Sequence, residues 1–159
     1  MKKKISLLIL LFFTPISCSD LVFVYDKKQI ESPLRTTTSW AINGDEKNIL
    51  GVLLGKKIKT AKKATYTLSV VSKKKETNII TETNQVATKI NLEFKIKYSL
   101  SFIKDNCLLY SDEITTEASY NAKSEGYSFG TDISKSKITE ELIEENIDSF
   151  LNKVEINIF

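Results

Sequence analysis

Two cysteines are the residues of this sequence whose chemistry is most readily interpreted. Cys18 follows the small residue Ser17 at the end of a short apolar run. This arrangement resembles a lipobox, in which the thiol is acylated and the peptide bond before it is cut. Pro15 departs from the lipobox pattern, where leucine is more usual. The alternative is a plain secretory signal with an incidental cysteine. We expect lipidation at Cys18, with this covalent lipid in place of any cofactor.

The segment before Cys18 has the composition of an export signal. Three lysines open it, and residues 5–13 are apolar except for Ser6. This run is too short to span a bilayer as a helix, which needs about 20 residues, but it suits a signal peptide. We therefore predict a lipoprotein signal peptide over 1–17, a tether over 18–38 and one domain over 39–159. Several lipid chains together would anchor the protein firmly to a membrane.

Cys107 is the only other cysteine in the chain. If Cys18 carries a lipid, Cys107 has no partner within the chain, and an intrachain disulfide is excluded even in a compartment that permits disulfides. An unpaired cysteine usually behaves as a small buried hydrophobe. We therefore expect Cys107 to be buried and unreactive.

The remaining residue types argue against catalysis. Histidine is absent, which removes Ser-His-Asp and Cys-His catalysis and histidine metal sites. The composition does not exclude a catalytic Ser/Lys dyad, but serine and lysine are so common in this sequence that their presence gives the dyad no support. Four carboxylates lie among helical apolar positions and are interpreted as a solvated helix face: Glu140, Glu141, Glu144 and Glu145. We expect no enzymatic activity and no metal site.

The overall charge argues against a nucleic-acid partner. The chain has 23 basic and 20 acidic residues, and loss of the three signal-peptide lysines leaves equal numbers of each. Nucleic-acid binding would require a clustered excess of positive charge. The sequence pI of 8.7 therefore overstates how basic the processed protein is.

The segment over 86–102 gives the clearest structural signal. Apolar side chains occupy seven successive even positions from Ile90 to Phe102, and polar side chains occupy the odd positions between them. This alternation predicts a strand with one buried and one solvated face. At about 3.3 Å per residue the strand would span roughly 55 Å, so we expect a twist or bulge along it.

The other predicted elements follow from weaker patterns. A turn at 104–106 should lead into an antiparallel strand over 108–121 whose apolar even positions are interrupted by Asp112 and Thr116, so that part of this face could meet solvent or a partner. Gly51 and Gly55 should weaken one helix while allowing it to pack closely on a sheet. The remaining predictions are a strand over 39–43, a helix over 46–58 capped by Asp45, a strand over 65–71, a polar turn within 72–84, and an amphipathic helix over 132–153.

These elements predict the fold class. Their order is βαβββα, and sheet faces and helix stripes must bury one another. We expect an α+β two-layer sandwich, with an antiparallel-rich four-stranded sheet and two helices packed on one of its faces.

Four short segments match a set of motifs in both order and spacing. Residues 65–70 match a Y-x-L-x-V strand, and residues 87–92 resemble A-T-R-x-x-L. Residues 98–100 match Y-x-L, and residues 119–121 followed by Tyr127 resemble S-Y-N…Y-A. Together these motifs resemble those of the LPS-assembly lipoprotein family LptE in its alphaproteobacterial form. The chain departs from the family where Ser19-Asp20 replaces Gly-Phe or Gly-Trp, and where the last helix lacks Ala/Arg richness.

The resemblance implies a non-enzymatic lipoprotein on the periplasmic side of the outer membrane. It would plug an LptD-like β-barrel and help deliver lipopolysaccharide to the cell surface. Lipopolysaccharide contact would fall on the nearest local positive charge, although a solvated turn is the plainer interpretation of these residues: Lys73, Lys74, Lys75 and Lys89. The rival hypothesis is an independent periplasm-facing lipoprotein that binds a small ligand. A concave apolar pocket would favour the rival, whereas a convex polar surface would favour the plug.

Overall fold

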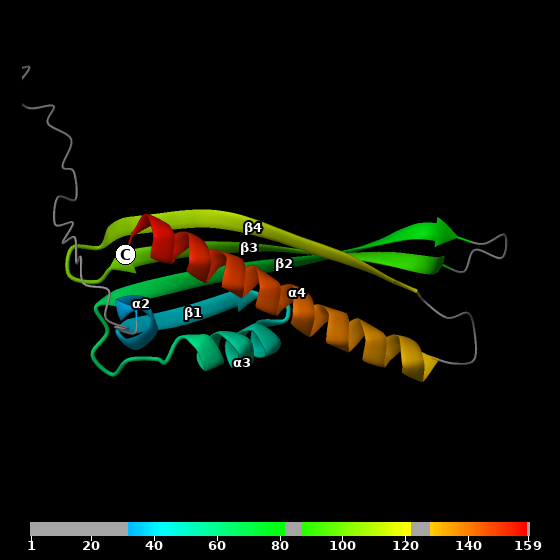
Figure 1. The fold of residues 1–159 in the computed structure, drawn as a ribbon, viewed down its shortest axis with the longest axis horizontal. Helices are drawn as coiled ribbons and strands as arrows, with labels where there is room; N and C mark the ends of the chain where they lie inside the picture. The colour runs from blue at the N-terminus through cyan, green and yellow to red at the C-terminus, as the bar shows by residue number, and fades with distance from the viewer. Residues whose placement is uncertain (1–31, 82–86, 122–127, 159) are drawn as a thin grey trace, which may run out of the picture.

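The computed structural model describes residues 32–81, 87–121 and 128–158 (Figure 1). The signal peptide expected over 1–17 and the lipidation site Cys18 lie outside the described residues. The elements in chain order are α2 (Pro33–Thr36), β1 (Thr38–Gly44), α3 (Lys47–Lys57), β2 (Tyr66–Thr81), β3 (Ala87–Phe102), β4 (Cys107–Asn121) and α4 (Ser128–Asn157).

The sheet has four strands in the order β1-β2-β3-β4. β1 pairs with β2 in parallel, which requires the crossover that α3 supplies, and the other two pairings are antiparallel. α3 and α4 lie on the same face of the sheet (Figure 1). The predicted two-layer α+β fold is therefore confirmed, with α2 as an additional short helix.

The alternation predicted for the central strand is confirmed. In β3 the even positions from Leu92 to Leu100 are fully buried, whereas Lys95 and Lys97 between them are exposed. Hydrophobic side chains of both helices cover these positions, among them Leu50 and Leu54 of α3 and Ile143, Ile147 and Phe150 of α4. The buried face of β3 thus carries the core.

The expected irregularity occurs near both ends of the long strands. The register between β3 and β4 shifts between Leu100 and Ser101, and the register between β2 and β3 shifts near Asn78 and Ile80. The first shift corrects the prediction that Leu108 lies on the apolar face of its strand. Leu108 pairs with Ser101 and is 59% exposed, because one extra residue in a strand moves the next side chain to the opposite face.

β2 is much longer than predicted. Residues 72–81, expected to end the strand and turn, continue it to Thr81. The polar side chains of this segment give no burial signal, and Thr77 and Asn78 are exposed. Pairing with β3 holds the segment extended, for example Lys75 opposite Glu93 and Thr77 opposite Asn91.

α3 forms where predicted, but it begins differently. Asp45 does not cap it, since the helix has no side-chain cap and the Asp45 carboxylate instead accepts a hydrogen bond from the Lys74 backbone N–H at 2.8 Å. Gly44 has φ +102°, and a Cβ there would lie 2.0 Å from the Ser72 carbonyl oxygen. Only glycine fits this turn between β1 and α3.

The glycines inside α3 are not required for close packing. A Cβ added to Gly51 or Gly55 would lie 3.7 Å from the Ile42 or Trp40 side chain, respectively, which is ordinary contact. Alanine would therefore fit at either position, and the packing of α3 on the sheet does not depend on these two glycines.

The predicted tether over 18–38 is too long at its C-terminal end. Leu34 of α2 and Thr38 are fully buried, and Arg35 forms an ion pair with Glu155 of α4 at 3.0 Å. These contacts place residues 32–38 in the folded domain.

α4 runs from Ser128 to Asn157, several residues beyond the predicted 132–153 at each end. Its predicted apolar stripe is confirmed, with Ile143, Ile147, Phe150 and Val154 fully buried. The carboxylates at 140, 141, 144 and 145 are exposed, as expected of a solvated face. Glu144 and Asp148 also hold the Lys57 ammonium of α3, at 3.2 and 2.6 Å.

A buried polar cluster joins α4 to the sheet. Tyr98 donates its hydroxyl proton to the Asn146 side-chain oxygen at 3.0 Å, and the Asn146 amide donates to the Ile114 carbonyl at 2.9 Å. Thr116 donates to the Leu142 carbonyl at 3.0 Å. Thr116 is therefore buried against the protein's own helix, which corrects the expectation for this residue, whereas Asp112, the other interruption of the apolar face, is only partly buried. Asn146 was not singled out in the sequence.

We expect Asn146→Ala to lower the free energy of unfolding by about 2–4 kcal/mol, because Tyr98 and Ile114 would each keep a buried polar group without its partner. Urea denaturation measures this loss. Glu145→Ala, an exposed change one position away, should stay within about 0.5 kcal/mol of the wild type. Equal losses in the two variants would contradict a role for the cluster in stability.

Candidate functional site

The sheet face opposite the two helices carries the most distinctive surface in the described residues. On β2 and β3 this face is formed by the odd-numbered positions. Four exposed lysines lie on it: Lys73 and Lys75 from β2, and Lys95 and Lys97 from β3. We call these four residues the lysine face. No described helix covers this face of the sheet (Figure 1).

The strand register sets like charges against each other on the lysine face. Lys73 lies directly opposite Lys95, and like charges in this position are unfavourable. Lys97 lies opposite Val71 on one side and Glu113 on the other. Lys95 approaches Glu93 at 3.5 Å, whereas Lys73, Lys75 and Lys97 form no ion pair with another described residue. An anion bound between Lys73 and Lys95 would relieve their repulsion.

Successive side chains of a strand point to opposite faces, so Lys74 lies on the other face of the sheet from Lys73 and Lys75. It points to the helix side, where its ammonium lies 2.9 Å from Glu46 and 3.1 Å from Glu76. Burial alone would lower the pKa of Lys74, but hydrogen bonds to these two carboxylates outweigh it and raise the pKa above its ordinary value. A hydrogen bond from Lys135, opposed by burial, lowers the pKa of Glu76. Lys74 is thus engaged within the protein.

The lysines singled out in the sequence are therefore only partly brought together. Lys73 and Lys75 share the lysine face, Lys74 lies on the other side, and Lys89 lies opposite Asn121 near the far end of β3. Sequence reasoning missed that Lys95 and Lys97 join Lys73 and Lys75. One signal in the sequence could have indicated this. Lys73 and Lys75 continue the period-two spacing of the outward-facing positions of the strand that begins at Tyr66.

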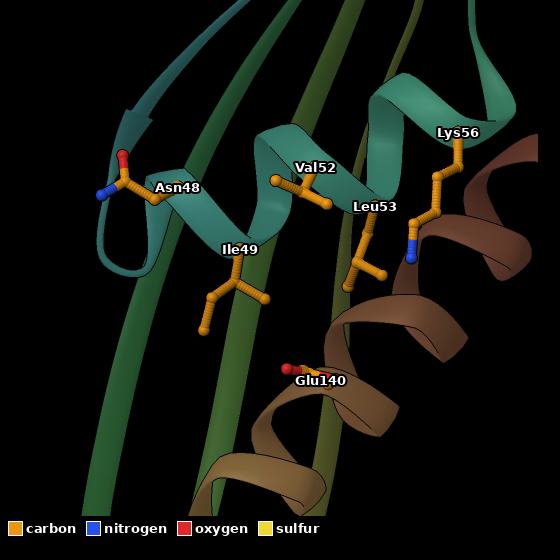
Figure 2. Close-up of a pocket in the computed structure, with 6 residues that line it drawn as sticks. All are labelled: Asn48, Ile49, Val52, Leu53, Lys56 and Glu140. Atoms are coloured by element: carbon orange, nitrogen blue, oxygen red, sulfur yellow. The ribbon is translucent and has the colours of Figure 1, made fainter.

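A shallow hollow lies between α3 and α4 (Figure 2). Its volume is about 260 Å³, and it is open to solvent. Ile49, Val52 and Leu53 of α3 form its apolar wall, and Glu140 of α4 faces them (Figure 2). Pockets for small ligands usually enclose about 300–1,000 Å³. The hollow is smaller and more open than such a pocket.

The described part of the chain holds neither a candidate metal site nor a candidate membrane-spanning helix. No group of three or more His, Cys, Asp or Glu side chains there could hold a metal ion. No helix there is both long and apolar enough to cross a membrane.

Cys107 differs from its prediction in two ways. Its side chain is half-buried at the start of β4, next to the turn after β3, and so does not belong to the core. Its sulfur is disulfide-bonded, whereas we expected a thiol without a partner. The chain's other cysteine, Cys18, lies outside the described residues.

Solved structures of three bacterial proteins resemble this fold. A candidate lipoprotein from Caulobacter crescentus has a TM-score of 0.57 at 15% identity, covering 78% of this chain and 90% of that one. A minor lipoprotein from Acinetobacter baumannii has a TM-score of 0.57 at 11% identity, covering 78% and 92%. Rare lipoprotein B from Shewanella oneidensis has a TM-score of 0.51 at 10% identity, covering 74% and 96%. The chain shares the fold of these proteins.

Comparison at the level of sequence gives no further relative. No protein-family model matches the chain, and no curated protein matches it.

The contrast between adjacent lysines gives a stability prediction. Lys74→Gln should lower the free energy of unfolding by about 1–2 kcal/mol, because Glu46 and Glu76 would lose their shared cation. Lys73→Gln should leave it unchanged or raise it by up to about 0.5 kcal/mol, because one of two opposed positive charges is removed. Urea denaturation at low ionic strength measures both. A larger loss for Lys73→Gln than for Lys74→Gln would contradict the placement of these side chains.

Proposed function

We propose that this chain is a non-enzymatic outer-membrane lipoprotein. It is anchored on the periplasmic side through a lipid on Cys18, plugs an LptD-like β-barrel and assists delivery of lipopolysaccharide to the cell surface. The observation that carries the proposal is the long, polar, helix-free sheet face with its four lysines. The shared fold with lipoproteins, including rare lipoprotein B, supports it.

The shape and polarity of the domain suit a water-filled barrel lumen. The open sheet face combines the four lysines with serine, threonine and asparagine side chains and with Val71, and acidic residues border the lysines on β3 and β4. Such a surface forms many hydrogen bonds and local charge pairs without long-range steering, which suits the balanced charge of the processed chain. Obligate interfaces bury more than about 2,000 Å², and a plug enclosed by its partner would reach that size.

The lysine face also supports the proposed contact with lipopolysaccharide. Lysine binds phosphate as a point charge, and the opposed pair Lys73 and Lys95 would be stabilised by an anion between them. Lys75 and Lys97 flank this pair. Lys89 would contribute near the end of the strand, whereas Lys74 is held by its own carboxylates and takes no part.

The rival function is an independent periplasm-facing lipoprotein that binds a small ligand. The hollow between α3 and α4 is its best candidate site in the described residues, and the apolar wall formed by Ile49, Val52 and Leu53 favours it. Its small volume and openness favour the plug instead.

Lipidation and a disulfide compete for one sulfur atom. A sulfur in a thioether to lipid cannot also form a disulfide, so a lipid on Cys18 requires that Cys107 be a thiol or be bonded to another chain.

Mass spectrometry of the protein extracted from membranes should find an acylated N-terminus at Cys18. Cys107 should then form no disulfide-linked peptide pair with Cys18, and Cys18→Ala should abolish the lipid. An unmodified N-terminus, one that starts elsewhere, or a Cys18–Cys107 peptide pair would refute lipidation.

Depletion of the protein tests the barrel partner. Without it, an LptD-like barrel should misassemble and lipopolysaccharide should fail to reach the surface, because the lumen would lack its plug. The wild-type protein should restore both functions and co-purify with the barrel from detergent extracts. If the barrel assembles normally and nothing co-purifies, the plug function is wrong and the independent-lipoprotein function replaces it.

Complementation with charge variants separates the barrel from lipopolysaccharide. Lys73→Glu with Lys95→Glu should still restore barrel assembly but lower lipopolysaccharide binding by at least about tenfold, the worth of one charge-assisted hydrogen bond. Lys47→Glu with Lys137→Glu makes the same charge change on exposed positions of the helix layer and should retain binding. Intact binding in the Lys73/Lys95 variant would remove the lysine face as the site.

A further inference from the structure

One end of the domain gathers the segments that lie nearest the N-terminal attachment. The Lys59 backbone N–H donates to the Arg35 carbonyl at 3.1 Å, which joins the loop after α3 to α2. The Ile103 N–H donates to the Thr65 carbonyl at 3.0 Å, and the ion pair between Arg35 and Glu155 adds the end of α4. Figure 1 shows these segments together at one end of the sheet. We call this the anchor-side end, since the chain before Ser32 joins it there.

Exposed apolar side chains concentrate at the anchor-side end. Ile103 is 46% exposed, Leu108 is 59% exposed and Ile156 is 83% exposed. The described residues include seven exposed large hydrophobic side chains, and these are three of them. The strand irregularity between Leu100 and Ser101 is what turns Leu108 outward. Isolated exposed hydrophobics are ordinary, but these lie around one end of an elongated domain.

The same end carries unpaired positive charge. Four exposed lysines lie in the loop after α3 and in the turn after β3, and none forms an ion pair with another described residue: Lys59, Lys62, Lys63 and Lys104. The acidic groups nearby are largely engaged, since Glu155 pairs with Arg35 and Asp112 pairs with Lys153. Asp105, in the turn after β3, is exposed and forms no ion pair with another described residue. The end therefore combines apolar side chains with a local excess of cations.

We propose that the anchor-side end rests against an anionic phospholipid surface. The inference depends on the lipid anchor of the proposed function and not on the barrel partner. Apolar side chains of surface-bound segments enter the headgroup region, while basic residues are attracted to anionic headgroups. Ile103, Leu108 and Ile156 would supply the first interaction and the four lysines the second.

The length of the tether supports a lipid surface as the occupant. Residues 18–31 can extend at most about 50 Å. The 16 residues of β3 span about 53 Å. A tether of this length cannot let the domain invert completely, so the anchor-side end stays within reach of the bilayer. It also limits how far this end can move to meet any other partner.

Photo-crosslinking tests the contact directly. The lipidated mature protein, carrying a benzophenone amino acid in place of Ile103 or Leu108, is reconstituted into phosphatidylcholine vesicles with or without phosphatidylglycerol. Illumination should give phospholipid adducts at both positions, in higher yield with phosphatidylglycerol. Ile79 is the matched control, because it is 51% exposed but lies near the opposite end of β2. Its adduct yield should be at least about tenfold lower.

A charge variant adds a second measurement. Lys62→Glu with Lys63→Glu should reduce the phosphatidylglycerol-dependent adduct by at least about fivefold, roughly the worth of one basic residue near an anionic surface. The inference would be overturned by equal yields of phospholipid adduct at positions 79 and 108. It would also be overturned if the benzophenone at 103 or 108 crosslinked to protein but not to phospholipid. Failure of lipidation would appear first as an unmodified Cys18 in the mass spectrum. A lipidated protein without phospholipid adducts would therefore refute this contact and leave the anchor intact.

Discussion

The alternation of β3 is the constraint on which the rest of the structure depends. Five even-numbered side chains from Leu92 to Leu100 must leave water together, and a helix layer on one side of the sheet is what removes them. α3 supplies part of that layer as the crossover between β1 and β2, and α4 supplies the rest along β3 and β4. The odd-numbered positions are then left on the opposite face. One strand thus determines both where the core lies and which surface stays open.

The buried cluster around Asn146 explains how α4 keeps one position on an edge strand. Apolar packing tolerates small shifts along a helix, whereas hydrogen bonds to Tyr98 and to the Ile114 carbonyl fix a single alignment. Burial raises the pKa of Tyr98 well above its ordinary value, so the phenol stays protonated and remains a donor. The Asn146 amide also occupies a backbone carbonyl of β4, and this helps to protect the outer strand of the sheet from pairing with other chains.

The proposed functions use surfaces that the core does not need. The lysine face lies across the sheet from the helices, and the anchor-side end lies where the chain before Ser32 attaches. The opposed pair Lys73 and Lys95 costs stability in the isolated domain, which is understandable if an anionic ligand compensates for it. A rigid two-layer domain keeps these two surfaces in a fixed relation, so that an anchored protein would present its lysines at a defined height above the bilayer.

The sequence by itself determined the elements that depend on local periodicity. The period-two pattern of β3, the apolar stripes of α3 and α4, and the turn in which Asn106 takes φ +51° are all visible in consecutive residues. The tertiary structure alone decided the rest. β2 extends to Thr81 because β3 pairs with it, and this pairing sets Lys73 against Lys95 while turning Lys74 toward Glu46. Leu108 faces outward because of a one-residue shift, and Asn146 is buried because Tyr98 and Ile114 receive it. Each of these outcomes depends on a partner far along the chain, which no local pattern specifies.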